Sequence, residues 1–319
     1  MNIIFFGSSK FAVLALSRII SSSHKIICVV TQPDRSKGRG LALSATEVKK
    51  LSEAHKLKIY QPENVNSQES AGFLENLTPD LFVVVAFGQI LSGPILGIPR
   101  IMAVNLHASM LPKYRGAAPV SWALIQGENQ TGMSIIRMSQ KLDAGPVILQ
   151  RSLDIRDDDD AQTLREGLAN LGADLLLEAL DSIQANKYSL VMQDEARGVT
   201  LAPKLKKEDG LIHWGKPARD IFNRIRGCAG WPGASTQYRG KILKIHKASL
   251  FLPHPLPASL PKGRAGEILQ ISKNGILVAT GQGNLLIQEL QIEGKGRTFA
   301  QEFISGYRPC AGEILGEKN

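Results

Sequence analysis

The first 190 residues alternate short apolar runs with segments of helical spacing. This alternation is typical of a sheet whose parallel strands are joined by helices, and it predicts a doubly wound, Rossmann-like α/β domain. The expected strands are 2–6, 25–30, 59–60, 81–87, 101–106, 132–138 and 146–155, and the expected helices are 11–22, 46–55, 67–76, 119–126 and a long one ending near 186. The acidic run 157–160 precedes that last helix, where negative charge is favoured, so we interpret it as a helix cap rather than a metal site.

The pattern changes after residue 208. One helix is predicted over 217–228, and it is followed by five short strands separated by glycine turns, which together favour a small barrel of the OB type. These strands are 235–238, 243–248, 266–271, 275–280 and 284–291, with a proline-rich exposed loop at 253–261. The polar stretch 190–208 reads as a linker, so we predict domains at 1–189 and 209–319.

Polar side chains gather where the strand 101–106 ends. Asn105 and His107 are two positions apart, so both point to the same side of the strand. Ligands of open α/β sheets bind outside the carboxyl ends of strands, which makes an amide and an imidazole there candidates for catalysis. Asp143 follows another apolar strand, and its carboxylate would favour the charged form of the imidazole. A histidine in a purely structural hydrogen bond is the alternative.

Composition narrows the class of protein. The chain is 43% hydrophobic and 21% charged, as in soluble globular proteins, and it holds neither a long apolar span nor a signal-peptide pattern. Its three cysteines are far apart, which predicts no disulfide framework and suits the cytoplasm. The histidines show no metal-ligand spacing, and no glycine fingerprint for a dinucleotide follows the first strand, so we expect neither a metal nor a nicotinamide cofactor.

The positive charge is concentrated in the second half. Residues 1–189 carry 19 Lys and Arg against 18 Asp and Glu, whereas residues 190–319 carry 19 against 11. The net charges are therefore +1 and +8 of the total +9. A basic half beside a nearly neutral one indicates that one domain performs the chemistry and the other binds a polyanion, unless the surface is merely basic in general.

Several motifs resemble the 10-formyltetrahydrofolate-dependent formyltransferase family, and the likeness runs from Ile3 to about residue 300. The motifs are Asn105-Leu106-His107, Ser109-Met110-Leu111-Pro112, Arg115-Gly116-Ala117-Ala118-Pro119 and Leu142-Asp143-Ala144-Gly145. The basic loop from Thr31-Gln32-Pro33-Asp34 to Gly40 and the motif Trp231-Pro232-Gly233-Ala234 resemble the branch of this family that acts on transfer RNA.

The resemblance implies formyl transfer from 10-formyltetrahydrofolate to the amino group of initiator Met-tRNA. Asn105, His107 and Asp143 would be catalytic, and no side chain would become acylated. The residues implied to contact the folate are Phe87, Gly88, Gln89, Ser109, Met110, Leu111 and Pro112. Those implied or expected to contact transfer RNA are Arg35, Lys37, Arg39, Lys204, Lys206, Lys207, Arg224, Arg226 and Lys244. We expect Trp231 in the core rather than as a platform for a base.

Three alternatives remain open at this point. A formyltransferase acting on an amino-sugar or on glycinamide ribonucleotide would need the same three catalytic residues, although it would not need the basic half. A hydrolase that deformylates the folate usually carries a further domain before the catalytic one. An RNA-binding protein without catalysis would not need Asn105, His107 and Asp143. We also expect a monomer without a membrane partner.

Overall fold

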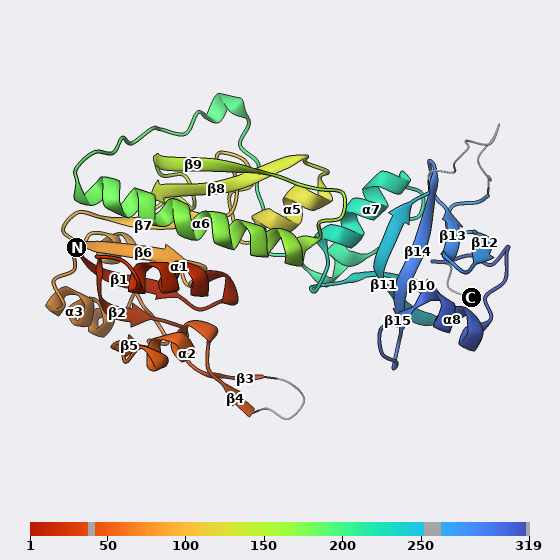
Figure 1. Cartoon of the computed structure of the whole chain (residues 1–319), viewed down its shortest axis with the longest axis horizontal. Helices are drawn as coiled ribbons and strands as arrows, with labels where there is room; N and C mark the ends of the chain where they lie inside the picture. Colours follow the sequence, from red (N-terminus) through yellow and green to blue (C-terminus); the bar gives the residue numbers. More distant parts are fainter. Residues whose placement is uncertain (38–41, 252–262, 317–319) are drawn as a thin grey trace. The chain divides into compact units, whose positions relative to one another are not determined.

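The computed structural model describes residues 1–37, 42–251 and 263–316. It separates into two compact units (Figure 1). The first unit consists of Met1–Pro119, Gln130–Asp154 and Arg165–Ala202, and the second of Val120–Asn129, Ile155–Leu164 and Pro203–Asn319. Two short segments that precede residue 190 in the sequence thus group with the second unit.

A seven-stranded sheet forms the centre of the first unit, in the order β5-β2-β1-β6-β7-β8-β9. The first five strands of this order are parallel, and β8 and β9 are antiparallel. The strands are β1 (Asn2–Gly7), β2 (Lys25–Val30), β5 (Ile59–Tyr60), β6 (Leu81–Val85), β7 (Met102–His107), β8 (Gln130–Arg137) and β9 (Val147–Asp154). The predicted doubly wound α/β domain is confirmed, with a mixed rather than purely parallel sheet.

Side chains cap the first turn of three helices in this region. The Thr46 hydroxyl accepts from the Lys49 N–H, Ser67 accepts from Ser70, and Asp160 accepts from Gln162 and Thr163. Each bond satisfies an N–H group that has no partner inside its helix. The helices are α1 (Lys10–Ile20), α2 (Glu47–Ala54), α3 (Gln68–Asn76), α4 (Gly93–Leu96), α5 (Pro119–Ile125) and α6 (Ala161–Gln184). The acidic run before α6 is therefore a cap, as predicted.

The stretch 32–44, which the sequence presents as a loop, contains a short hairpin. Its strands are β3 (Arg35–Lys37) and β4 (Ala42–Ser44). Asp34 anchors the base of the hairpin, because its carboxylate accepts from Lys49 Nζ at 2.6 Å and from Gln61 Nε2 at 2.8 Å. These two bonds lower the pKa of Asp34. Arg39 lies outside the described residues, as does the predicted loop 253–261.

The second unit is built on an antiparallel sheet in the order β10-β11-β14-β13-β12, with β15 paired to β14. Its elements are the 3₁₀ turn η2 (Lys207–Gly210), α7 (Ala218–Gly227), β10 (Ala234–Tyr238), β11 (Lys241–Leu250), β12 (Ile268–Ser272), β13 (Gly275–Ala279), β14 (Asn284–Ile292), β15 (Thr298–Phe299) and α8 (Ala300–Tyr307). The 3₁₀ turn η1 (Glu195–Arg197) belongs to the first unit. The core packs Trp214 and Tyr238 with apolar residues of α7 and α8. The five predicted strands are confirmed, whereas β15 and α8 were not foreseen.

Candidate active site

Strand β7 places Asn105 and His107 at the carboxyl end of the first sheet. Asn105 lies beside Val84 of β6 and Ile136 of β8, and His107 lies beside Ser134. The apolar residues before them are buried on both faces of the sheet, which fixes the register of the strand. A rigid strand therefore holds the two polar side chains at the carboxyl end of the sheet.

The structure brings Asp143 to both of these side chains. Asn105 Nδ2 donates to Asp143 Oδ1 at 3.3 Å, and His107 Nδ1 lies 3.6 Å from Asp143 Oδ2. The same Oδ2 accepts from the Gly116 N–H at 2.9 Å. The side chains of His107 and Asp143 are only 6% and 9% exposed, so little water screens them from each other. The expectation that the three residues form one cluster agrees with this geometry.

The second nitrogen of His107 has a partner of its own. Nε2 lies 2.9 Å from the carbonyl oxygen of Tyr114. Because a carbonyl oxygen only accepts, Nε2 carries a hydrogen in this bond. Nδ1 then faces the Asp143 carboxylate. The imidazole is thus hydrogen-bonded at Nε2 and lies next to the carboxylate at Nδ1, so two flanking segments define its ring orientation.

Asp143 sits in a turn that imposes an unusual backbone. Its φ is +48°, in the left-handed region that non-glycine residues rarely adopt. Gly145 two residues later allows the turn to close, because a Cβ there would overlap the carbonyl oxygen of Arg137. Local backbone strain of this kind persists only where surrounding bonds hold it.

The residues proposed to contact the folate form two groups. Phe87 is buried against Phe6. The side-chain amide of Gln89 forms hydrogen bonds with the backbone of residues 62–65. In this stretch a ligand could therefore contact the exposed backbone around Gly88. In the second group the Ser109 hydroxyl donates to Lys113 and its carbonyl accepts from Ser134. The Leu111–Pro112 peptide bond is cis, and Met110 is partly buried.

The residues expected to bind transfer RNA differ in how exposed their side chains are to solvent. Arg35 on the hairpin is exposed and pairs with Glu63 at 2.7 Å, and Lys37 lies in the same strand. In the second unit Lys204, Lys206 and Lys207 are exposed, and Lys244 on β11 is partly buried. Arg224 is partly buried and donates to the Asp209 carbonyl.

Arg226 is not available for phosphate, which corrects the prediction. It is 8% exposed, and its guanidinium donates to the carbonyls of Arg156 and Asp159 and to the Asn223 amide oxygen. Burial lowers the pKa of this guanidinium. The expectation for Trp231 was also wrong: its side chain is 55% exposed rather than part of the core.

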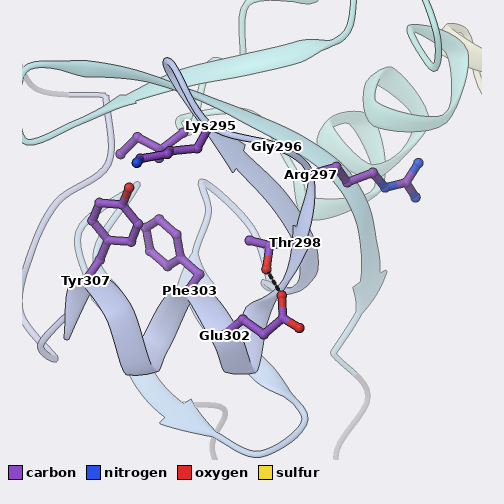
Figure 2. Close-up of a pocket in the computed structure, with 8 residues that line it drawn as sticks. Lys295, Gly296, Arg297, Thr298, Glu302, Phe303 and Tyr307 are labelled. Atoms are coloured by element: carbon purple, nitrogen blue, oxygen red, sulfur yellow. Dashed lines mark hydrogen bonds between the residues drawn. The ribbon is translucent and has the colours of Figure 1, made fainter.

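Two further features were not recognised from the sequence. Gln193, in the stretch assigned to a linker, donates to the carbonyl oxygens of Asp143 and Gly145. Figure 2 shows a pocket of about 390 Å³ in the second unit, with Lys295 above Phe303 and Tyr307 and with Arg297 to the side, its guanidinium pointing away from the two rings. A basic pair on either side of Gly296, Lys295-Gly296-Arg297, was the available signal for the second feature.

Comparisons with known proteins identify the family of the chain. Residues 1–180 match the formyl transferase family, and residues 204–308 match the formyl transferase C-terminal domain. A methionyl-tRNA formyltransferase of Geobacter metallireducens is 44% identical over 99% of both chains, and one of Geobacter sulfurreducens is 43% identical over 99% of this chain and 97% of its own. The solved structure of HypX from Aquifex aeolicus in complex with tetrahydrofolic acid has a TM-score of 0.62 at 16% identity, covering 100% of this chain and 51% of the other.

Proposed function

The chain belongs to the formyl transferase family, and we propose that it moves the formyl group of 10-formyltetrahydrofolate to the α-amino group of the methionyl moiety of initiator Met-tRNA. The observation that carries the proposal is the cluster of Asn105, His107 and Asp143 at the carboxyl end of β7, in a chain whose full-length relatives are methionyl-tRNA formyltransferases.

The reaction is an acyl transfer without a covalent enzyme intermediate. The neutral amine of the methionyl group attacks the formyl carbon, and a C–N bond forms while the carbonyl oxygen takes up negative charge. Collapse of this tetrahedral species breaks the bond to the folate nitrogen. The amine loses one proton, and the folate nitrogen gains one, so the products are formyl-methionyl-tRNA and tetrahydrofolate.

The three side chains match the needs of this reaction. Asn105 uses one amide N–H on Asp143, and its second N–H is a donor for the developing oxyanion. His107 sits beside it with one nitrogen facing a carboxylate, and so it can accept and return the proton of the amine. Asp143 holds both side chains through its two oxygens. The proposal requires no metal.

The formyl donor and the Met-tRNA acceptor would meet at the carboxyl end of β7. The folate would lie along the exposed backbone near Gly88 and against residues 109–112. For the acceptor we propose Arg35 and Lys37 of strand β3, and Arg39 outside the described residues, together with the exposed lysines that follow the first unit. The set in the second half is Lys204, Lys206, Lys207 and Lys244, with Arg224 retained and Lys295 and Arg297 added.

This division of labour assigns the chemistry to residues 1–189 and transfer RNA binding mainly to residues 209–319. The excess of eight positive charges after residue 189 supports it. No helix of the described part of the chain is long and apolar enough to cross a bilayer. We place the protein in the cytoplasm, as a monomer, as part of the same proposal.

A direct comparison of acceptors tests the function. The purified protein is incubated with labelled 10-formyltetrahydrofolate and, in parallel, with charged initiator Met-tRNA, an amino-sugar nucleotide or glycinamide ribonucleotide. We expect label to appear on Met-tRNA with a kcat/KM at least 100-fold above the other acceptors. Preferential labelling of either small amine would replace this proposal with the small-amine alternative.

A further inference from the structure

Residues 191–202 bind along the first unit instead of spanning open solvent as a linker would. Val191 exchanges two backbone hydrogen bonds with Val147 at the start of β9, at 2.8 and 2.9 Å. Further along, the Arg115 N–H donates to the Thr200 carbonyl and the Ala202 N–H donates to the Arg115 carbonyl. The Thr200 hydroxyl also accepts from the Tyr114 N–H at 2.8 Å. We call residues 191–202 the clasp segment.

The clasp segment holds the two stretches that contact the catalytic carboxylate and imidazole. One is the turn 143–145, which carries Asp143. The other is 114–116, in which the Tyr114 carbonyl accepts from His107 Nε2 and the Gly116 N–H donates to Asp143 Oδ2. Both stretches contain a non-glycine residue with positive φ, Tyr114 at +59° and Asp143 at +48°. Such conformations need support from outside the turn.

Gln193 is the side chain that joins these two stretches. Its Nε2 donates to the carbonyl of Asp143 at 2.7 Å and to that of Gly145 at 2.8 Å. Its Oε1 accepts from Arg115 Nε at 3.1 Å and from Arg115 Nη2 at 2.8 Å. Carbonyls only accept and a guanidinium only donates, so these partners allow one orientation of the amide. All its hydrogen-bonding capacity is directed at the supports of the site.

We propose that Gln193 is a positioning residue for the formyl transfer, acting through Asp143. Gln193 fixes the backbone of the turn that carries the Asp143 carboxylate. It also binds the side chain of Arg115, the residue before Gly116, whose N–H donates to that carboxylate. Loss of these bonds would let the Asp143 carboxylate move away from His107. Because Asp143 Oδ2 and His107 Nδ1 are already 3.6 Å apart, a further displacement would weaken their interaction. This inference rests on the proposed function.

The test is a double-mutant cycle in the full-length protein. Gln193→Met keeps the length of the side chain and removes its four hydrogen bonds, and Gln193→Glu keeps the acceptor for Arg115 and loses both donors. Both variants should lower kcat for Met-tRNA about tenfold or more, since small misplacements of a catalytic group have effects of up to about 10². KM for Met-tRNA should stay within twofold.

The cycle separates positioning from general damage. In an Asp143→Asn background, the Gln193→Met change should cost less than twofold in kcat, because the carboxylate it supports is gone. Glu195→Gln is the matched control, since Glu195 also pairs with Arg115 but is 70% exposed and does not contact the turn. It should retain the wild-type kcat. Thermal unfolding of each variant checks that the protein is folded.

Two results would overturn the inference. One is a wild-type kcat in Gln193→Met. The other is an equal fold-loss from Gln193→Met in the wild-type and Asp143→Asn backgrounds, which would indicate a general structural role. Failure of the proposed function is a different outcome, because it would appear in the unmutated protein as an absence of Met-tRNA formylation.

Discussion

Replacing Arg226 with methionine should destabilise helix α7 by about 3 kcal/mol. The guanidinium donates to the Arg156 carbonyl at 2.8 Å, the Asp159 carbonyl at 3.3 Å and Asn223 Oδ1 at 2.7 Å, and it lies 4.7 Å from the centre of the Phe222 ring. Leaving a buried acceptor without its donor costs about 1–3 kcal/mol. Only Asn223 is buried, whereas Arg156 is exposed and Asp159 is partly exposed, so their carbonyls lose less than a buried acceptor would. Relief of the buried charge and of the unpaired Nε offsets a further part of the loss, which leaves about 3 kcal/mol.

Hydrogen exchange followed by mass spectrometry measures this effect locally. A loss of about 3 kcal/mol accelerates exchange of the α7 amides roughly 100-fold. Arg219→Gln on the same helix is the control: Arg219 is 51% exposed and its partner Asp157 is 80% exposed, so its loss should cost less than about 1 kcal/mol. The salt dependence of transfer RNA binding should be unchanged in Arg226→Met. Equal exchange in the two variants, or a flattened salt slope for Arg226→Met, would refute the assignment of Arg226 as a structural residue.

Further predictions concern catalysis, binding and pH. Asn105→Ala and His107→Ala should each lower the single-turnover rate by about 10²-fold or more with unchanged transfer RNA affinity, and near-normal rates would remove them from the site. Asp143→Asn should lower the rate by a similar factor, whereas a variant as fast as wild type would show that its charge is dispensable. Lys206→Gln should reduce the slope of log affinity against log salt by about one, measured by filter binding; an unchanged slope would exclude a phosphate contact. Burial lowers the pKa of His24 from 6.5, so the native state resists the proton that the unfolded chain takes up, and stability falls as pH drops below 6.5. Urea unfolding at pH 7.5 and 5.5 should show a smaller loss for His24→Gln than for wild type, and equal losses would contradict this.

The sequence pattern was sufficient to predict the parts of the site that lie on regular secondary structure. Strand β7 is a continuous apolar run, so its position and the shared side of Asn105 and His107 follow from the period of two. Asp143 could be placed at the end of β8, but its contact with His107 could not be read from spacing. That contact depends on the left-handed turn at Asp143 and on the N–H of Gly116, which come from loops.

Basic residues were harder to interpret, because charge in a sequence does not reveal burial. The helical spacing of α7 puts Ile221 and Ile225 on one face, which gives no reason to expect that Arg226 is buried as well. The segment 155–164, more than 60 residues earlier in the chain, supplies the carbonyls that bury Arg226. Conversely, Trp231 is apolar enough to suggest a core, yet its turn leaves it 55% exposed. The error for Arg226 comes from contacts that are distant in sequence, and the error for Trp231 comes from its local turn.

The clasp segment was missed for a related reason, and its chemistry explains why. Most of its contacts are made by backbone groups of Val191, Thr200 and Ala202, which every residue type possesses. Its large apolar side chains point outward, with Met192 72% and Leu201 72% exposed, so it shows no buried face that periodicity could detect. Gln193 is its one long amide facing the turn, and a single glutamine in a polar stretch is unremarkable. The carboxylate at the centre of the site is thus supported by a segment that only the folded chain brings to it, which is why mutation of Gln193 examines a part of the site that motif comparison does not reach.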